Sequence, residues 1–166
     1  MAELLPIIAF RGAVLPEWVD LNRHMNSMAY ANLFWSHLAG LFRRIGISPD
    51  YPRDRRLSIF QREAHIGWER ELLEGQEIEI RSWLIGHDEK RIHHFHELWD
   101  VANDRRAATM EYLSFHIDLA ARRTGPIPDD IKANLQLLMD GFAALPVPAG
   151  AGQAIALRKG EARRAA

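Results

Sequence analysis

One segment of the chain gathers the residue types that hydrolytic chemistry needs. The segment from Asp20 to Asn26 supplies an acid, two amides and a histidine. It follows a strand-like run, Ile7 to Val19, and precedes an apolar run with helical spacing that extends to Ile45. Free backbone N–H groups and the dipole at a helix N-terminus favour negative charge that develops during a reaction. The segment is therefore a place where a carbonyl group can be attacked.

Asp20 is the predicted acid of this segment. Its carboxylate can direct a water onto a carbonyl carbon or attack that carbon itself. Backbone N–H groups from about His24 to Ser27 would then hold the oxyanion. Asn22, His24 and Asn26 are predicted to orient the water, hold Asp20 or cap the helix. Two alternatives stay open: Asp20 only accepts local backbone hydrogen bonds as a turn residue, and His24 is purely structural.

The elements that must position this segment follow from changes in the hydrophobic period. From Ser27 to Ile45 the apolar residues cover nearly the whole circumference of a helix, so something must wrap it, and a curved sheet is the expected wrapper. Four later runs alternate as strands do, are separated by short turns, and so predict an antiparallel meander. These runs are Leu57 to Glu69, Glu77 to Ile85, Arg91 to Val101 and Ala107 to Leu119. The predicted fold class is α+β.

The sequence also predicts a C-terminal helix and the bounds of the domain. A modest helix is expected from Asp129 to Phe142. Residues 1–145 are predicted to form one domain. Residues 146–166, rich in Ala, Gly and Pro and then basic, are predicted to form a flexible tail.

Composition excludes several classes of protein. The chain has 166 residues, a net charge of -1 and no cysteine. It therefore lacks the basic excess of a nucleic-acid-binding protein and can form no disulfide, thiolate nucleophile or zinc–thiolate site. The first residues do not follow the pattern of a signal peptide, and no apolar run approaches the roughly 20 residues of a membrane span. We expect a cytoplasmic protein without a nucleic-acid or membrane partner.

The same segment, continued to Tyr30, resembles the signature D-x-D-x-x-G-H-V-N-N-x-x-Y of the hotdog-fold acyl-CoA thioesterases of the 4-hydroxybenzoyl-CoA type. Aligned on His24 and Tyr30, Asp20 falls on the second acidic position of that signature. A tryptophan fills the first, and Glu17, one place before it, is the alternative acid. Arg23 replaces the usual glycine, which argues against a turn with positive φ at that point.

The helix that follows the signature distinguishes between groups of hotdog thioesterases. The enzymes of the phenylacetyl-CoA type carry their catalytic acid on that helix. Here the run from Ser27 to Ile45 contains no Asp or Glu. The resemblance therefore implies the group whose acid lies in the loop.

Later segments extend the resemblance to the thioesterases associated with carnitine dehydrogenases, described as betainyl-CoA thioesterases. The matching residues are Glu63 to Ile66, Glu71, Gly75, Asp88 to His93, His116 to Asp118, Arg122, Arg123, Pro126 and Pro128. This likeness implies a sheet of five antiparallel strands around a long central helix. It also implies pairing through the sheet into homodimers or dimers of dimers, with active sites between subunits. The implied substrate is an acyl-CoA, with no cofactor other than the coenzyme A that the substrate carries.

Aromatic side chains suit the acyl group that this resemblance implies. The trimethylammonium of a betainyl group binds well against aromatic faces. Trp18 and Trp35 flank the signature, and Tyr30 lies one turn into the helix, where its hydroxyl can point back to the loop. The alternative for each of them is a place in the core or in a dimer interface.

Basic pairs are candidates for the phosphates of coenzyme A. Lys90 and Arg91 lie at a hairpin, and Arg122 and Arg123 follow the last strand. Either pair can form charge-assisted hydrogen bonds with phosphate, although exposed basic pairs are usually only solvated surface.

No metal site is predicted. His94 and His96 share a strand face, but no carboxylate motif near them completes a ligand set. A polar face at the sheet or at an interface is the expected explanation.

Two rival functions remain open at this point. One is a non-catalytic acyl-CoA-binding module on the same scaffold. The other is a dimeric interaction protein without a small-molecule site. Release of thiol from an acyl-CoA separates the predicted hydrolase from both.

Overall fold

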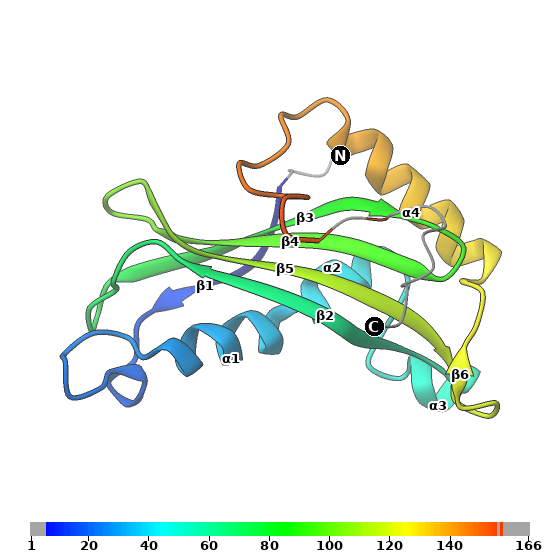
Figure 1. Ribbon diagram of the computed structural model, residues 1–166, viewed down its shortest axis with the longest axis horizontal. Coiled ribbons are helices and arrows are strands. Elements are labelled where there is room, and N and C mark those ends of the chain that lie inside the picture. The colour runs from blue at the N-terminus through cyan, green and yellow to red at the C-terminus, as the bar shows by residue number, and fades with distance from the viewer. Residues whose placement is uncertain (1–5, 156, 158–166) are drawn as a thin grey trace, which may run out of the picture.

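The structure is a computed structural model and describes residues 6–155 and 157 (Figure 1). Six strands form one antiparallel sheet in the order β1-β3-β4-β5-β2, and the short β6 pairs with β5. The strands are β1 (Ile7–Ala13), β2 (Leu57–Trp68), β3 (Glu77–His87), β4 (Arg91–Asp100), β5 (Arg105–Asp118) and β6 (Arg123–Thr124). Strands β2 and β1 are therefore the two edges of the sheet. The predicted α+β class is confirmed. The predicted antiparallel meander holds for β3, β4 and β5 but is wrong for β2, which crosses over to pair with β5 and is not a neighbour of β3.

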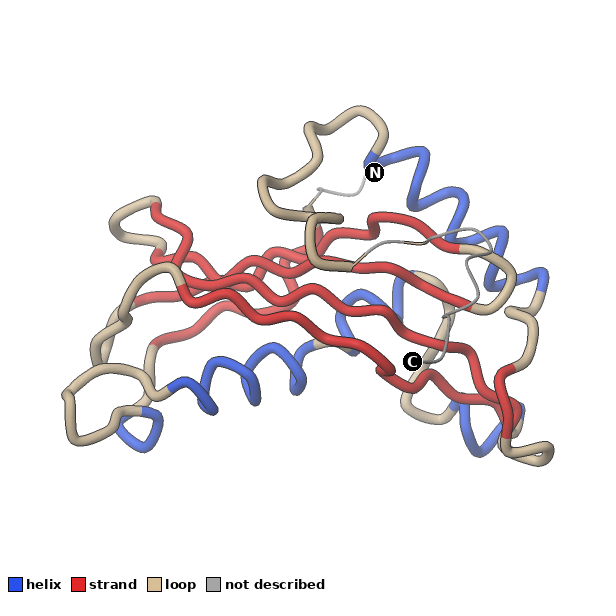
Figure 2. The backbone as a smooth tube through the Cα atoms, in the orientation of Figure 1, coloured by secondary structure: helices blue, strands red, loops and turns tan. Residues whose placement is uncertain are grey.

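The helices lie on both sides of the sheet (Figure 2). They are the 3-10 turn η1 (Pro16–Trp18), α1 (Ser27–His37), α2 (Ala39–Arg44), α3 (Tyr51–Arg55) and α4 (Asp129–Phe142). In Figure 1, α1 lies below the strands and α4 lies above them. Helix α4 has the predicted bounds and packs on β3, where the ring centroid of Phe142 is 5.6 Å from that of Trp83.

The first strand is shorter than the predicted run from Ile7 to Val19. It ends at Ala13, and Pro16 then begins the 3-10 turn. Proline fixes φ and has no N–H to donate, so it interrupts the ladder. Val19 contributes only an isolated bridge to Met25. The chain thereby turns before the candidate site.

The central helix is broken into α1 and α2, which corrects the predicted single helix from Ser27 to Ile45. At Leu38 the N–H bonds to the carbonyl of Trp35, three residues back, and α2 starts at Ala39. Next to the break, a Cβ on Gly40 would lie 3.1 Å from the Cβ of Ala9 on β1. The absence of a side chain at Gly40 thus lets α2 approach the sheet closely.

The helix is also not wrapped all round within one chain. Leu33 and Phe34 of α1 and Leu41 and Phe42 of α2 are buried against the sheet, whereas Met28 is 65% exposed and Trp35 is 55% exposed. One face of the helix therefore remains open in the single chain.

A chain of polar side chains crosses the buried inner face of the sheet. Ser82, His96, His94 and Ser114 are linked by contacts of 2.8, 2.7 and 2.7 Å. Both histidines are buried, and one proton on each ring satisfies the whole chain. Burial lowers the pKa of His96 to about 3, and burial, with the neighbouring His96 as a lesser cause, holds the pKa of His94 well below its usual value. The polar face predicted for His94 and His96 is confirmed, and both rings are neutral.

The outer face of the sheet carries the C-terminal segment. The Glu111 carboxylate accepts from the N–H groups of Gly152 and Ile155, at 2.6 and 3.3 Å, and from the ring of His93. The Arg106 guanidinium donates to the carbonyl of Ala149 at 2.7 Å. Within the predicted tail over 146–166, Ala149, Gly152 and Ile155 thus contact the sheet. Residues 156 and 158–166 of that tail lie outside the described residues.

In the described part of the chain, no helix has the length and apolar character that a membrane span requires.

Candidate active site

A tight turn presents the candidate residues. The Asp20 N–H donates to the carbonyl of His24 at 3.1 Å, and the Arg23 N–H donates to the carbonyl of Asp20 at 2.9 Å. The bridge between Val19 and Met25 closes the turn. Arg23 has a φ of 65°, so the expectation that an arginine here argues against a positive-φ turn is wrong. The hydrogen bonds of the turn outweigh the modest cost of placing a Cβ in that conformation.

The Asp20 carboxylate is held in place by its own turn. One oxygen, Oδ1, accepts from the Asn22 N–H at 2.8 Å. This is the local bond of a turn residue that the sequence left open as an alternative role. Among the described residues no donor reaches the second oxygen, so that oxygen can still accept from a water or face a carbonyl.

Asn26 caps helix α1, as predicted. Its Oδ1 accepts from the Ala29 N–H at 2.9 Å, and its Nδ2 donates to the carbonyl of Trp18 at 3.0 Å. The side chain thus satisfies one free helix donor and fixes the 3-10 turn against the helix. This amide is an anchor of the site.

The free N–H donors at the helix N-terminus belong to Ser27 and Met28, at and just beyond the end of the predicted range from His24 to Ser27. The Met25 N–H donates to the carbonyl of Leu72 at 2.7 Å, and the Asn26 N–H donates to that of Trp18 at 2.9 Å. The next two N–H groups, of Ser27 and Met28, have no acceptor among the described residues. They are the first two donors of the helix and point in the direction of its dipole.

A cavity of about 330 Å³ opens beside these donors. The residues that line it are Glu17, Trp18, Asn26, Met28, Ala29, Asn32, Leu33, Ser36 and His37. The structure therefore brings together Trp18, Asn26 and the alternative acid Glu17. Asp20, Asn22, His24 and Tyr30 are not among the lining residues.

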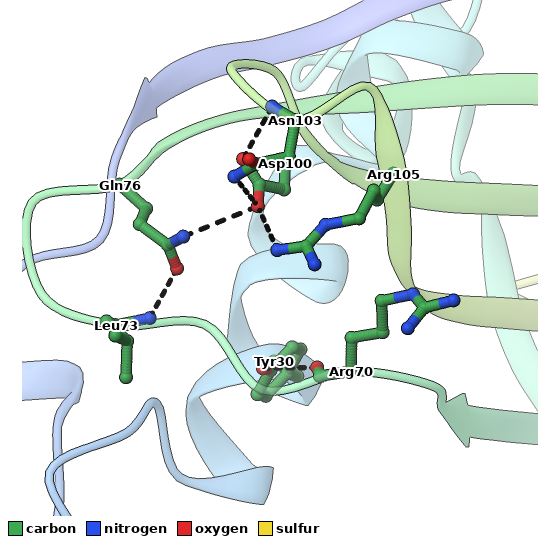
Figure 3. Close-up of polar contacts among 7 residues, drawn as sticks. All are labelled: Tyr30, Arg70, Leu73, Gln76, Asp100, Asn103 and Arg105. Atoms are coloured by element: carbon green, nitrogen blue, oxygen red, sulfur yellow. Dashed lines mark hydrogen bonds and ion pairs between the residues drawn. The ribbon is translucent and has the colours of Figure 1, made fainter.

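The side chains of His24 and Tyr30 make contacts with the backbone. His24 Nδ1 lies 3.3 Å from the carbonyl oxygen of Met25. The Tyr30 hydroxyl is buried and donates to the carbonyl of Arg70 at 3.1 Å (Figure 3). Burial raises the pKa of Tyr30 to about 12, so its hydroxyl stays protonated and keeps this bond.

Gln76 and Asp100 form a support that sequence patterns gave no reason to choose (Figure 3). The loop between β2 and β3 accepts two hydrogen bonds from the candidate site: the Arg70 carbonyl accepts from the Tyr30 hydroxyl, and the Leu72 carbonyl accepts from the Met25 N–H. Gln76 holds this loop, because its Oε1 accepts from the Leu73 N–H at 2.6 Å and its Nε2 donates to Asp100 at 3.3 Å.

Asp100 is a buried carboxylate whose partners keep it ionised. Asn103 Nδ2 and Arg105 Nη2 donate to it at 2.8 and 3.0 Å. Burial alone would raise the pKa of Asp100, but the hydrogen bonds from Asn103 and Arg105 outweigh burial and lower that pKa below its usual value. The loop beneath the site is thus tied to a fixed charge in the sheet.

Trp35 and Trp18 face different cavities. Trp35 lines a second cavity of about 350 Å³, together with Phe42 and Tyr51. The two tryptophans flank the signature in the sequence, yet within one chain they do not form a single aromatic wall.

The structure separates the two basic pairs that were candidates for phosphate binding. Arg91 is held by Asp88, whose carboxylate accepts from the backbone N–H of Arg91 at 2.8 Å and from its Nε at 2.6 Å. Lys90 is exposed beside it, and its backbone N–H also donates to Asp88. Arg122 and Arg123 instead line a third cavity, of about 260 Å³.

The fold and this loop place the protein among hotdog-fold proteins, and comparison with known families agrees. Residues 14–135 match the thioesterase-like superfamily, and the chain belongs to that family. It is 32% identical over 151 residues to the betainyl-CoA thioesterase of Pseudomonas aeruginosa, covering 91% of this chain and 95% of that protein. It is 33% identical over 142 residues to the L-carnitine dehydrogenase/betainyl-CoA thioesterase of Rhizobium meliloti, but spans only 28% of that longer protein.

Solved structures have the same architecture. A putative thioesterase of Pseudomonas putida KT2440 matches with a TM-score of 0.77 and 28% identity over 94% of this chain and 99% of the other. A Staphylococcus aureus protein determined in complex with CoA matches with a TM-score of 0.82 and 21% identity over 94% and 99% of the two chains. The predicted hotdog fold is confirmed.

Proposed function

We propose that this protein is an acyl-CoA thioesterase and that betainyl-CoA is its substrate. The observation that carries the proposal is the 32% identity to the betainyl-CoA thioesterase of Pseudomonas aeruginosa over 95% of that protein. The signature loop supports it, because the loop is built against a helix N-terminus with two free donors. Trp18, which lines the cavity beside these donors, offers an aromatic ring that suits a trimethylammonium group one methylene away from the carbonyl carbon.

The proposed mechanism places the thioester oxygen at the N–H groups of Ser27 and Met28. These donors stabilise the oxyanion of the tetrahedral intermediate. Asp20 takes a proton from water as the water oxygen adds to the carbonyl carbon, or its carboxylate adds directly. Collapse of the intermediate breaks the C–S bond, and the thiolate of CoA leaves. In the general-base route the thiolate takes the proton that Asp20 received from water. In the direct route the collapse leaves a mixed anhydride on Asp20, which a water molecule hydrolyses to the free acid and the regenerated carboxylate, and the proton released goes to the thiolate. No metal or redox cofactor takes part in these steps.

Asp20 remains the proposed acid in preference to Glu17. The bond from Asn22 fixes one oxygen of Asp20 and thereby orients the other. Glu17 lines the cavity, but no hydrogen bond fixes its carboxylate among the described residues. A fixed carboxylate loses less entropy when the transition state forms.

The proposed functional unit is a homodimer or a dimer of dimers joined through the sheet. Strand β2 is an edge, and Phe60 and Trp68 on it are each about half exposed. Pairing of two β2 edges would satisfy the free backbone donors and acceptors of both edges. It would also cover the open face of α1.

A non-catalytic acyl-CoA-binding module is the second candidate. The observation that favours it is that Asp20 already serves its own turn and does not line the cavity. This candidate predicts binding of an acyl-CoA without release of CoA.

Release of free thiol from a panel of CoA thioesters tests the proposal. The panel contains betainyl-CoA, short aliphatic acyl-CoA and aromatic acyl-CoA, and the proteins are the native enzyme, Asp20→Asn, Glu17→Gln and the control Asp129→Asn. Asp129 is fully exposed on α4, far from the signature in sequence, so its variant is expected to behave as native.

We expect fast release from betainyl-CoA and a loss of about 100-fold or more in Asp20→Asn. Loss in Glu17→Gln instead would move the acid to Glu17. Release from other thioesters only would refute the substrate, and binding without release from any thioester would establish the second candidate.

A further inference from the structure

The third cavity lies on the outer side of the sheet, where β2, β5 and β6 meet. Its volume is about 260 Å³. The residues that line it are Phe60, Arg62, Ile117, Leu119, Arg122, Arg123 and Thr124. Ile117 pairs with both Ser58 on β2 and Thr124 on β6, so the sheet itself fixes the walls.

Three arginines converge on this cavity without a matching acid. Among the described residues, no carboxylate lies within ion-pair distance of Arg62, Arg122 or Arg123. Elsewhere in the sheet the arginines are paired: Arg105 with Asp100 at 3.0 Å and Arg106 with Glu69 at 2.7 Å. An uncompensated group of guanidinium ions is an attractive site for an anion with several charges.

The acid nearest in sequence to Arg122 and Arg123 already has hydrogen-bond partners. Asp118 Oδ1 accepts from the N–H groups of Ala120 and Ala121, both at 2.9 Å. The bond from Ala121, with the positive charge of Arg123 as a smaller cause, lowers the pKa of Asp118. Asp118 therefore shapes the turn that presents Arg122 and Arg123 and does not form an ion pair with either of them.

The cavity also offers a flat apolar surface. Phe60 is 48% exposed, and Ile117 and Leu119 lie beside it in the lining. The Arg62 guanidinium lies 5.5 Å from the centre of the Phe115 ring, which orients it along the strand. An exposed aromatic ring flanked by arginines suits a purine base joined to phosphates.

We propose that this cavity binds the phosphorylated adenosine end of coenzyme A. The inference rests on the proposed function and names the part of the substrate that this surface recognises. Guanidinium groups bind phosphate through paired, charge-assisted hydrogen bonds, and three of them match the several phosphates of this nucleotide. The Lys90–Arg91 pair is the weaker candidate, because Asp88 holds Arg91.

The cavity and the candidate active site lie at opposite ends of β2. The signature loop bonds to Arg70 and Leu72, just after the Trp68 end of the strand. Phe60 is eight positions from Trp68, which corresponds to about 26 Å along a strand. If two β2 edges pair antiparallel, the Phe60 end of one protomer lies beside the Trp68 end of its partner. The nucleotide would then be held by one protomer and the thioester by the other.

Two thioesters of the same acyl group test this inference. One is the CoA thioester and the other is the pantetheine thioester, which lacks the nucleotide. The variants are Arg62→Ala, Arg122→Ala and the double variant. The controls are Arg43→Ala, an exposed arginine of α2 outside all three cavities, and Lys90→Ala, which tests the other basic pair.

We expect KM for the CoA thioester to rise about tenfold for each arginine removed, since each loses a charge-assisted hydrogen bond. The double variant should have the native KM for the pantetheine thioester. Equal effects on both thioesters, no effect on either, or an effect of Lys90→Ala in place of the arginine variants would overturn the inference.

Calorimetric titration with free CoA and with pantetheine separates this inference from the proposed function. The titration needs no turnover, so it decides the matter even if no thioester is hydrolysed. Weaker binding of CoA to the double variant, with pantetheine binding unchanged, supports the nucleotide site. Equal binding of CoA to native and double-variant protein refutes it.

Discussion

At the scale of single residues, hydrogen-bond partners decide which polar side chains are free to act. The hydroxyl of Tyr30 is committed to a backbone carbonyl, and the amide of Asn26 is committed to the helix end. Asp20 keeps one oxygen without a described partner. The sequence identifies all three residues, but their partners come from the fold, and Arg70 lies 40 positions from Tyr30.

The buried histidines make a prediction about acid stability. His96 has a pKa of about 3 in the folded protein because of burial, against about 6.5 in the unfolded chain. Below pH 6.5 the unfolded state therefore binds a proton that the folded state does not. The neutral His96 ring therefore costs no stability above pH 6.5, and the free energy of unfolding falls as the pH drops from 6.5 towards 3. At pH 5 the loss from His96 is about 2 kcal/mol, and His94 acts in the same direction.

Urea unfolding between pH 7.5 and 5 measures this loss. The acids with lowered pKa values, such as Asp100 and Glu79, titrate at lower pH and do not obscure the window. The free energy of unfolding of His96→Gln should decline less steeply with falling pH than that of the native protein. The control His65→Gln, at an exposed position on β2, should decline as the native protein does. A native protein whose stability is flat between pH 6.5 and 5 would contradict the neutral state of both rings.

At the scale of elements, alternation and turn residues were sufficient to place the strands. β2 to β5 begin and end within two residues of their predicted bounds, because each turn carries its own glycine, asparagine or aspartate signal. The break at Leu38 could not be predicted, since the helical spacing of apolar residues continues across it, and the close approach of Gly40 to Ala9 appears only in the fold. The hydrogen bond from Gln76 to Asp100 could not be predicted either, because it joins a loop residue to the end of β4, 24 positions away.

The loop between β2 and β3 should depend on Gln76. In Gln76→Ala the Leu73 N–H loses its acceptor and Asp100 loses one donor, so the loop is held less firmly beneath the signature. We expect faster hydrogen exchange at the amides of Leu73 and Met25 and a fall in kcat with little change in KM. Gln136→Ala is the matched control, because among the described residues its side-chain amide bonds to Asp140 of the same helix, α4, and to no loop. Native exchange rates at Leu73 and Met25 in Gln76→Ala would show that the loop needs no such support.

At the scale of the whole molecule, the single chain has an unpaired sheet edge at β2 and several exposed large apolar side chains. Met28 and Trp35 on α1 and Trp68 on β2 are each more than half exposed. Exposed apolar patches of this kind mark interfaces. A dimer through β2 would also shorten the distance from the arginine cavity to the helix N-terminus, as coenzyme A requires.

Mixed dimers test this arrangement directly. Asp20→Asn subunits keep the arginine cavity, and Arg62→Ala/Arg122→Ala subunits keep the proposed acid. If each active site takes Asp20 from one protomer and the arginines from the other, a mixed dimer has one intact site and one site with both defects. Random reassociation of equal amounts should then restore about a quarter of the native sites, measured as thiol release at a CoA thioester concentration below KM. If both groups serve the same site from one protomer, every site of the mixture retains one defect, and the activity of the mixture stays at the mean of its parents.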